Sequence, residues 1–384
     1  VMQQNKRIVI IAGEESGDAH AASFAKKLLE INPNLILSGI GGKHMEDAGV
    51  HLISDLARYG VTGLSEVIRH FLVIRQAFND IKKHLSENKP DLLVLVDYPG
   101  FNLRLAKFAK QQLGIPVLYY ISPQIWAWKA NRIHTIRNNV DHMAVILPFE
   151  KTLYNKADVP VSFVGHPLVK TVQSNSEASE LRQQFNLPCN KRLIAMLPGS
   201  RVHEIERLMP VLSETMQRLL QKMDDLHFVI PVARTIEPTL IQSYLAQLNP
   251  KSYTLIKGHS IETVACSDCV VVASGTASLE CALLKKPMCI IYKGSLLSYI
   301  AAMKLIKVKY LGLCNLLQNE MIAPELLQYD CNATELTHTL TALLNDEEVK
   351  QRMVKRLGRL CDSLSSQAAD CSIEQLIIQF CNSR

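Results

Sequence analysis

The chain of 384 residues lacks a long uncharged apolar run, and no stretch approaches the ~18–20 residues that a membrane-spanning helix needs. We therefore expect no transmembrane segment. Cysteine is absent from the first 188 residues, and all ten cysteines lie between Cys189 and Cys381 at irregular spacings. The chain also opens directly into a β-rich run without a secretory signal, so we expect reduced thiols and a cytoplasmic protein.

Several signatures of metal and cofactor sites are also missing. Cys266 and Cys269 form a C-x-x-C without a second pair, which argues against zinc. Arg207 stands where the second histidine of an H-E-x-x-H motif beginning at His203 would be. The predicted strand ends carry no dinucleotide fingerprint, Walker loop or G-x-S-x-G elbow. The D-x-D motif, which usually binds the divalent ion of a nucleotide sugar, is absent too, so we expect no metal and no cofactor.

The composition is that of a globular protein, with 48% hydrophobic and 20% charged residues. The length is sufficient for two domains, each with its own core. The formal net charge of +6 would suit an anionic ligand or an acidic membrane surface, although charge alone establishes neither. We expect no nucleic-acid partner.

Short, continuously apolar runs alternate with helical patterns throughout the chain, as in parallel sheets that helices cover on both faces. The predicted strands are residues 7–12, 35–40, 92–97, 116–121, 142–147, 161–165, 192–198, 227–232, 253–258, 269–274 and 288–293. A polar, serine-rich stretch after Pro167 separates two such series. The sequence therefore predicts an α/β protein with two Rossmann-like, doubly wound domains, 1–168 and 169–365, facing each other across a cleft.

The loop after the first predicted strand, "AGEESGDAH", is a candidate part of that cleft. Glycines allow a sharp turn, and Ser16 or Asp18 could cap the helix that follows. The candidate residues of this cleft loop are Gly13, Glu15, Ser16, Gly17 and Asp18. The alternative is a capped loop without any further role.

Two strand-to-helix turns of the second half favour a phosphate ligand. In "LPGSR", Arg201 presents donors that match phosphate oxygens. In "SGTASLE", Ser274, Gly275 and Thr276 open a helix whose amides could hold a diphosphate, and Glu280 lies one helical turn further along, where it could accept from ribose hydroxyls. The alternatives are that Ser274 only caps the helix and that Glu280 only pairs with a lysine.

Asp97 ends the apolar run "LLVLV" at a position where ligands of parallel sheets bind. Pro99 and Gly100 follow at once. Its carboxylate is therefore a candidate catalytic group, and the alternative is that it caps a helix that begins near Asn102.

Taken in order, "AGEESGD", "LVDYPGFN", "YYISPQIWAW", "LPFEK", "FVGHPL", "LPGSR" and "SGTASLEC" resemble the lipid-A-disaccharide synthase family over nearly the whole chain. The resemblance implies a GT-B fold and a hexosyltransferase of lipid A and lipopolysaccharide biosynthesis in Gram-negative bacteria. The implied reaction moves 2,3-diacylglucosamine from UDP-2,3-diacylglucosamine to the 6-hydroxyl of 2,3-diacylglucosamine 1-phosphate. The products are UDP and a β-1,6-linked tetraacyl disaccharide 1-phosphate, so the anomeric configuration inverts.

The resemblance also implies roles for individual residues. Inversion needs a single base, and the essential aspartate of the family matches Asp97. The implied UDP-binding residues are Arg201, Ser274, Gly275, Thr276, Glu280 and Asn315. His166, in "FVGHPL", either contacts a phosphate or positions the linker. The first domain would hold the acceptor and face the membrane, the second would bind the UDP-sugar, and a last helix at about 366–384 would return to the first domain.

Acylated substrates suggest contact with a membrane. Val67, Ile68, Phe71 and Leu72 lie on one helical face, which is ordinarily a core face but becomes a candidate lipid-facing patch. A second amphipathic stretch, residues 296–313, carries several lysines that suit an anionic bilayer. We expect peripheral attachment to the inner face of the cytoplasmic membrane.

Two other functions remain open at this stage. A UDP-sugar epimerase of similar architecture would consume its substrate without an acceptor, and a non-catalytic glycolipid-binding protein would not need Asp97. The oligomeric state is also open, with a homodimer among the alternatives.

Overall fold

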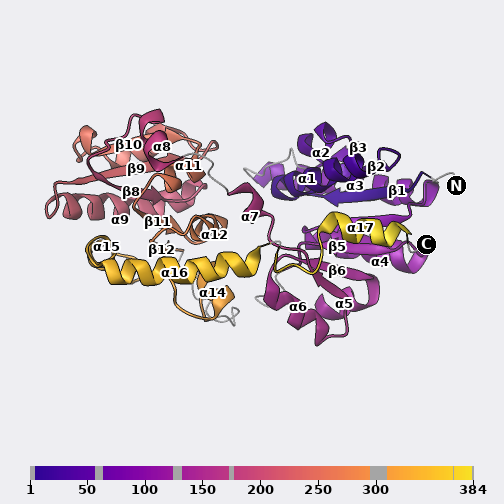
Figure 1. Ribbon diagram of the computed structural model, residues 1–384. Coiled ribbons are helices and arrows are strands. Elements are labelled where there is room, and N and C mark those ends of the chain that lie inside the picture. The colour runs from indigo at the N-terminus through magenta and orange to yellow at the C-terminus, as the bar shows by residue number, and fades with distance from the viewer. Residues whose placement is uncertain are drawn as a thin grey trace. The chain divides into compact units, whose positions relative to one another are not determined.

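The computed structural model describes residues 5–56, 64–123, 132–172, 177–294, 309–365 and 367–382, with side chains from residue 72 onward in the second range. The chain forms two compact units, Val1–Pro167 with Leu364–Arg384 and Leu168–Ser363 (Figure 1). The domain ends expected at residues 168 and 365 lie one and two residues further along the chain than the ends of these units.

The first unit is built on a seven-stranded parallel sheet with the strand order β3-β2-β1-β4-β5-β6-β7. Its elements are β1 Arg7–Ala12, α1 Glu15–Ile31, β2 Ile36–Gly41, α2 Lys43–Asp47, β3 His51–Asp55, α3 Leu64–Glu87, β4 Leu92–Val96, α4 Pro99–Leu113, β5 Val117–Tyr120, α5 Arg132–Asn139, β6 His142–Val145, α6 Pro148–Asn155, β7 Val161–Phe163 and, from the end of the chain, α17 Ile373–Asn382.

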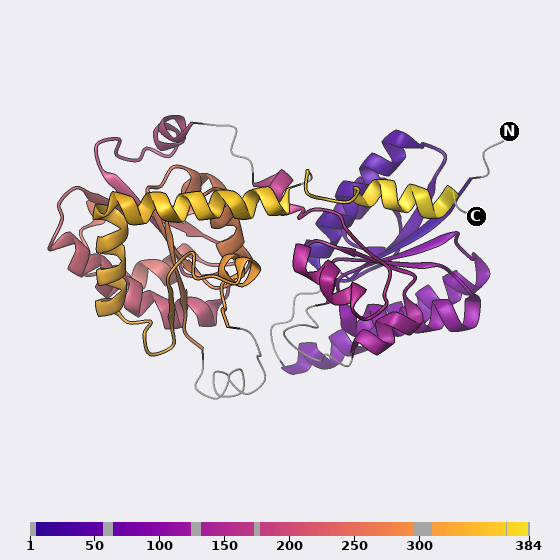
Figure 2. The same cartoon turned by 60° about the horizontal axis from the view of Figure 1, so that its bottom comes forward.

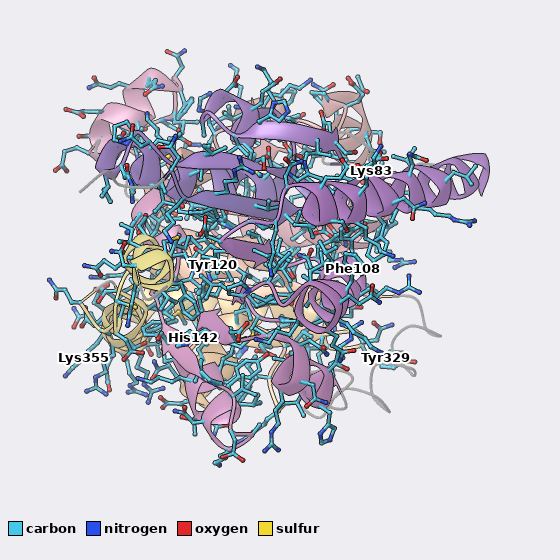
Figure 3. The ribbon with its side chains drawn as sticks, turned by 90° about the vertical axis from the view of Figure 1, so that its right-hand side faces the viewer. Lys83, Phe108, Tyr120, His142, Tyr329 and Lys355 are labelled. Atoms are coloured by element: carbon cyan, nitrogen blue, oxygen red, sulfur yellow. The ribbon has the colours of Figure 1, made fainter. Side chains whose placement is uncertain are left out.

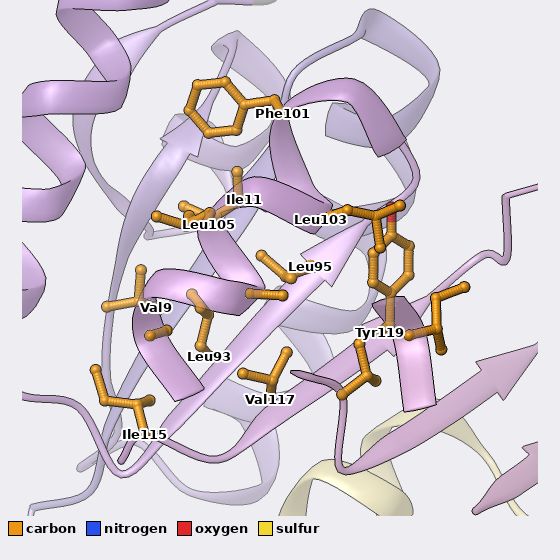
Figure 4. Close-up of a cluster of buried hydrophobic side chains, with 14 of the residues drawn as sticks. Val9, Ile11, Leu93, Leu95, Phe101, Leu103, Leu105, Ile115, Val117 and Tyr119 are labelled. Carbon is orange, nitrogen blue, oxygen red and sulfur yellow. The ribbon is translucent and has the colours of Figure 1, made fainter. Parts of the chain in front are cut away.

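Successive residues of each strand point to opposite faces of this sheet, so continuously apolar strands feed two separate cores. Leu93 and Leu95 of β4 pack with α3, α4, α5 and α6 (Figure 4). Val94 and Val96 pack on the other face with α1, α2 and α17. This double burial explains why the strand β4 contains no polar residue.

The C-terminal segment is attached to the first unit. The main-chain N–H of Asp370 donates to the carbonyl of Phe163 (2.8 Å), and the Asp370 carboxylate accepts from the N–H of Phe163 (2.8 Å) and from Lys151 Nζ (2.6 Å). Figure 3 shows Tyr120 and His142 on the side of the sheet where α17 lies, and the His142 ring meets the Phe380 ring edge to face at 5.7 Å. The α17 helix therefore completes the core of the first unit.

The second unit contains a six-stranded parallel sheet with the order β10-β9-β8-β11-β12-β13. Its elements are α7 Leu168–Thr171, α8 Ala178–Gln184, β8 Arg192–Leu197, α9 Val202–Leu220, β9 Leu226–Val232, α10 Pro238–Tyr244, the 3₁₀ turn η1 Pro250–Ser252, β10 Tyr253–Lys257, α11 Ser260–Ala265, β11 Cys269–Ala273, α12 Thr276–Leu283, β12 Met288–Tyr292, α14 Leu313–Gln318, β13 Glu325–Leu327, α15 Ala333–Asn345 and α16 Glu347–Leu364. Figure 2 shows α15 and α16 meeting at an angle on one side of this unit.

In both sheets the order in which successive strands are added reverses once. In the first sheet the order reverses between β1 and β4, and in the second between β8 and β11. In open parallel sheets the loops at the carboxyl ends of the two strands that flank such a reversal part from each other, and ligands bind in the crevice between them. The four loops singled out from the sequence are the ones that follow these four strands.

Among the residues that the structure describes, none of the helices combines the length and the apolar composition that a bilayer span requires.

Candidate active site

The loops that follow β1 and β4 are packed against each other at the reversal of the first sheet. Ala12 and Val96, the last residues of the two strands, are paired in the parallel ladder. A Cβ atom on Gly13 would lie 2.2 Å from Cδ1 of the Tyr98 ring, so only glycine permits this contact. The predicted cleft loop and Asp97 therefore belong to one site.

Asp97 and Tyr98 form a strained turn between β4 and α4. Their φ angles are +46° and +48°, in a region that residues other than glycine rarely adopt. Tyr98 is the N-cap residue of α4, and its side chain makes no capping hydrogen bond. Because Tyr98 and not Asp97 is the N-cap residue, the geometry does not support the alternative that Asp97 serves only as a helix cap. Strained residues of this kind cluster at functional sites.

The carboxyl group of Asp97 is partly buried, and its pKa is raised from 3.8 to about 6. Burial is the largest cause and the negative charge of Glu14 the second, while a hydrogen bond from the main-chain N–H of Tyr98 opposes the shift. Burial and the Glu14 charge also raise the pKa of the Tyr98 phenol. The structure therefore adds Glu14 to the site, a residue that sequence reasoning missed although it stands beside Gly13 and Glu15.

The other residues of the cleft loop divide into exposed and structural positions. Glu15 and Ser16 are exposed, and both lie inside α1, which begins at Glu15, so Ser16 does not cap it. Asp18 is 1% exposed. Its carboxylate accepts hydrogen bonds from the amides of Gly42 (2.7 Å), His44 (3.0 Å) and Met45 (3.1 Å) at the start of α2.

The prediction that Asp18 caps the helix after β1 was therefore wrong, because it holds the start of α2. A Cβ atom added at Gly17 would lie at ordinary contact distance from the Val96 side chain (3.7 Å) and carbonyl (3.8 Å), next to the turn that carries Asp97.

A pocket of about 450 Å³ lies at the carboxyl edge of the second sheet. It brings together four of the predicted UDP-binding residues, Arg201, Ser274, Gly275 and Thr276. The lining also includes residues that sequence reasoning missed: Gly258 and His259 from the loop after β10, Ser260 at the start of α11 and Glu204 from α9. Gly258 and His259 both have positive φ angles, +73° and +52°, and the pair "GH" after a predicted strand is the one signal that could have pointed to this loop.

The two helix starts in this pocket differ in what they already bind. At α9, Glu204 Oε2 accepts from the amides of Ser200 (3.0 Å) and Arg201 (3.3 Å), so a carboxylate of the protein occupies this start. Glu204 also lies 3.6 Å from the Arg201 guanidinium, whose side chain is 72% exposed.

In the described part of the chain, no side chain caps α12. Gly275 has a φ of +148° and no atom within 4 Å of an added Cβ. Ser274 does not cap the helix, because the N-cap residue is Gly275. Of the N-termini of α9 and α12, only that of α12 is not occupied by a described side chain, and it is therefore suited to an anion.

The remaining two predicted UDP-binding residues lie outside this pocket lining. Burial raises the pKa of Glu280, and no ion pair to a lysine or arginine is seen for it among the described residues. Asn315 is fully buried: Nδ2 donates to the Ala323 carbonyl (2.7 Å) and to Glu325 Oε1 (2.8 Å), and Oδ1 accepts from the amides of Ile322 (2.7 Å) and Ala323 (2.9 Å). The structure thus gives Asn315 a role in holding the loop before β13.

His166 lies where the chain passes between the two units. Its main-chain N–H donates to the carbonyl of Leu364 (3.1 Å), so the two crossing segments of the chain are tied together. Burial, followed by the nearby charge of His20, lowers the pKa of His166 to about 4. Of the two predicted alternatives, this geometry favours the positioning of the linker.

The predicted lipid-facing residues are only partly covered by the structure. Leu72 of α3 is 58% exposed. The side chains of Val67, Ile68 and Phe71 lie outside the described part of the chain, as do residues 296–308 of the second amphipathic stretch.

Across the described ranges, no three His, Cys, Asp or Glu side chains gather where they could share a metal ion. Cys266 and Cys269 are both buried thiols, and burial raises their pKa values.

Similarity to solved structures defines the class of fold. The chain aligns with the glycosyltransferase of kitacinnamycin with a TM-score of 0.62 and 12% identity, covering 98% of this chain and 100% of that one. It aligns with UDP-GlcNAc 2-epimerase from Neisseria meningitidis, solved with UDP-GlcNAc bound, with a TM-score of 0.61 and 14% identity, covering 93% of this chain and 99% of that one. The predicted α/β, GT-B type of fold is thereby confirmed, and fold alone does not separate transferase from epimerase.

Sequence similarity is more specific. A family model described as lipid-A-disaccharide synthetase matches residues 8–378. Lipid-A-disaccharide synthase 1 of Legionella pneumophila (strain Philadelphia 1) is 56% identical over 377 residues, which are 98% of this chain and 98% of that protein. The chain belongs to the lipid-A-disaccharide synthase family, as the motifs had indicated.

Proposed function

We propose that this protein is the inverting glycosyltransferase that forms the lipid A disaccharide. It transfers 2,3-diacylglucosamine from UDP-2,3-diacylglucosamine to the 6-hydroxyl of 2,3-diacylglucosamine 1-phosphate. UDP and the β-1,6-linked tetraacyl disaccharide 1-phosphate are released. Family membership over nearly the whole chain supports this reaction over the epimerase and over a non-catalytic binding role.

The observation that carries the mechanism is the state of Asp97. A general base must be ionised at working pH and still hold a proton well, so its best pKa lies near that pH. A pKa of about 6 leaves Asp97 roughly nine-tenths ionised at pH 7 and makes it about a hundredfold stronger as a base than an ordinary aspartate. Asp97 thus takes the proton of the acceptor hydroxyl while the oxygen of that hydroxyl attacks the anomeric carbon of the donor sugar.

The leaving diphosphate has a matching place in the second unit. As the bond between the anomeric carbon and the phosphate oxygen breaks, negative charge grows on the β-phosphate of UDP. The open start of α12 at Gly275 and Thr276 offers main-chain amides and the positive end of a helix, and Arg201 adds an exposed guanidinium. We assign the diphosphate to α12 because Glu204 already occupies the start of α9. No metal is required for this step.

The test is disaccharide formation by wild type and Asp97→Asn, with both acylated substrates and an added chelator. Asp91→Asn is the matched control, since Asp91 stands at the other end of β4 and pairs with Lys6 at 3.3 Å. We expect wild type and Asp91→Asn to work with the chelator present, and Asp97→Asn to bind UDP but to lose at least a hundredfold in kcat. If Asp97→Asn retained most of the rate, the base would have to be another residue; if UDP-sugar were consumed without acceptor, the epimerase would be favoured.

We further propose peripheral attachment to the inner face of the cytoplasmic membrane through the patch on α3 that includes Leu72. Support comes from the exposure of Leu72 and from the acyl chains of both proposed substrates. Flotation with anionic vesicles tests this: Leu72→Gln is expected to float less than wild type, and equal flotation would contradict it. Light scattering decides between monomer and homodimer.

A further inference from the structure

Tyr119 is a fully buried phenol whose hydroxyl bonds to the main chain of Asp97. The side chain is 0% exposed and belongs to the core between the first sheet and α3 to α6. Figure 4 shows its ring beside the end of the strand that carries Leu93 and Leu95. The Tyr119 hydroxyl donates to the carbonyl oxygen of Asp97 over 2.6 Å. Phenylalanine would fill the same space, so the hydroxyl itself has to be explained.

All main-chain hydrogen-bonding groups of Asp97 are engaged. Its carbonyl also accepts from Asn102 Nδ2 (2.7 Å), and its N–H donates to the carbonyl of Tyr120 (3.0 Å). Asn102 is itself 0% exposed, in the first turn of α4. Asp97 is therefore held by β5 on one side and α4 on the other.

These hydrogen bonds hold Asp97 in a backbone conformation that is otherwise unfavourable. The left-handed φ angles of Asp97 and Tyr98 persist only where neighbouring groups enforce them. A return to ordinary angles would swing the Cα–Cβ bond of Asp97 and move its carboxylate by more than an ångström, and displacement on that scale can cost a catalytic group most of its effect.

We propose that Tyr119, together with Asn102, is a positioning residue of the transfer reaction: its hydroxyl holds the Asp97 carbonyl and so keeps the turn in which the Asp97 carboxylate takes the acceptor proton. This inference rests on the proposed function, in which Asp97 is the base. Tyr119 does not touch the substrate in this scheme and acts only through Asp97.

The experiment compares Tyr119→Phe with Tyr154→Phe. Tyr154 is an equally buried tyrosine of the same core, and its hydroxyl lies 2.6 Å from Ser122 Oγ, so the two variants lose one hydrogen bond of equal length. We expect Tyr119→Phe to lower kcat about tenfold, with KM for both substrates and Kd for UDP changed less than twofold. Tyr154→Phe should keep kcat within twofold, and Asn102→Ser should behave like Tyr119→Phe.

A second measurement separates positioning from general loosening of the core. In an Asp97→Asn background the carboxylate is gone, so Tyr119→Phe should change the residual rate less than twofold. A further tenfold loss there, or equal kcat values for Tyr119→Phe and Tyr154→Phe, would overturn the inference and leave the assignment of Asp97 intact. Full activity of Asp97→Asn alone would instead overturn the proposed function.

Discussion

Asp97→Asn is expected to make the protein more stable at neutral pH while it slows transfer at least a hundredfold. In the folded protein, burial and the charge of Glu14 raise the pKa of Asp97 from 3.8 to about 6. A difference of about two pKa units corresponds to ~3 kcal/mol by which the folded state disfavours the ionised carboxylate at neutral pH. Asparagine carries no charge and can still accept from the Tyr98 amide, so most of this cost disappears.

The pH dependence fixes the sign of the effect. Because the pKa of Asp97 is higher in the folded state than in the unfolded state, the folded state holds more protons between the two values, and its stability falls as pH rises from about 4 to about 6. The advantage of Asp97→Asn should therefore reach ~1–3 kcal/mol above pH 7 and vanish near pH 4.

Urea denaturation at pH 7.5 and pH 4.5 measures this difference, since urea adds no ionic strength. Asp91→Asn provides a control of opposite sign, because that variant loses the ion pair with Lys6 (3.3 Å), whereas its amide oxygen can still accept from the Arg7 amide. An Asp97→Asn protein less stable than wild type at pH 7.5, or a gain of equal size at both pH values, would refute the account of Asp97 as a buried, destabilised base.

Three further predictions concern other parts of the chain. Gly275→Ala should weaken UDP binding in a calorimetric titration and cost ~1 kcal/mol of stability, because alanine is strained at a φ of +148° despite the open space there; unchanged affinity would exclude α12 as the diphosphate site. His166→Gln should reduce acid sensitivity, because a pKa of about 4 for the buried imidazole means that wild type loses up to ~3 kcal/mol as pH falls from 6.5 through 4; identical acid unfolding curves would contradict this. Ile377→Ala, in the core under α17, should lower the free energy of unfolding of the first unit by ~2–4 kcal/mol, and a smaller loss would mean that α17 adds little to that core.

The central strands were predictable because parallel strands covered on both faces must be apolar throughout. Eleven runs of this kind were identified, and each corresponds to a strand of the structure. The two strands that were missed, β3 and β13, are edge strands, and none of their residues is fully buried. An edge strand has one neighbour and partial cover, so its sequence need not form an apolar block.

The location of Asp97 was predictable for a similar reason, since the carboxyl end of a buried strand is where a doubly wound sheet binds ligands. The hydrogen bonds of Asp18 and Asn315 were not, because their amide partners lie seven or more residues away along the chain. Tyr119 resembles any apolar core position in the sequence. Only the fold reveals that its hydroxyl donates to the carbonyl of Asp97.

The two units use the same architectural position for opposite electrostatic purposes. At the reversal of the first sheet, Glu14 and burial disfavour negative charge on Asp97, which makes that carboxylate ready to take a proton. At the reversal of the second sheet, the open start of α12 and Arg201 favour negative charge. An inverting displacement needs this division, because the proton is removed on the side of the attacking oxygen and the diphosphate leaves on the other side of the anomeric carbon. The groups that tune each site come from its own unit, with Glu14 and burial acting on Asp97 in the first and the start of α12 with Arg201 forming the anion site in the second.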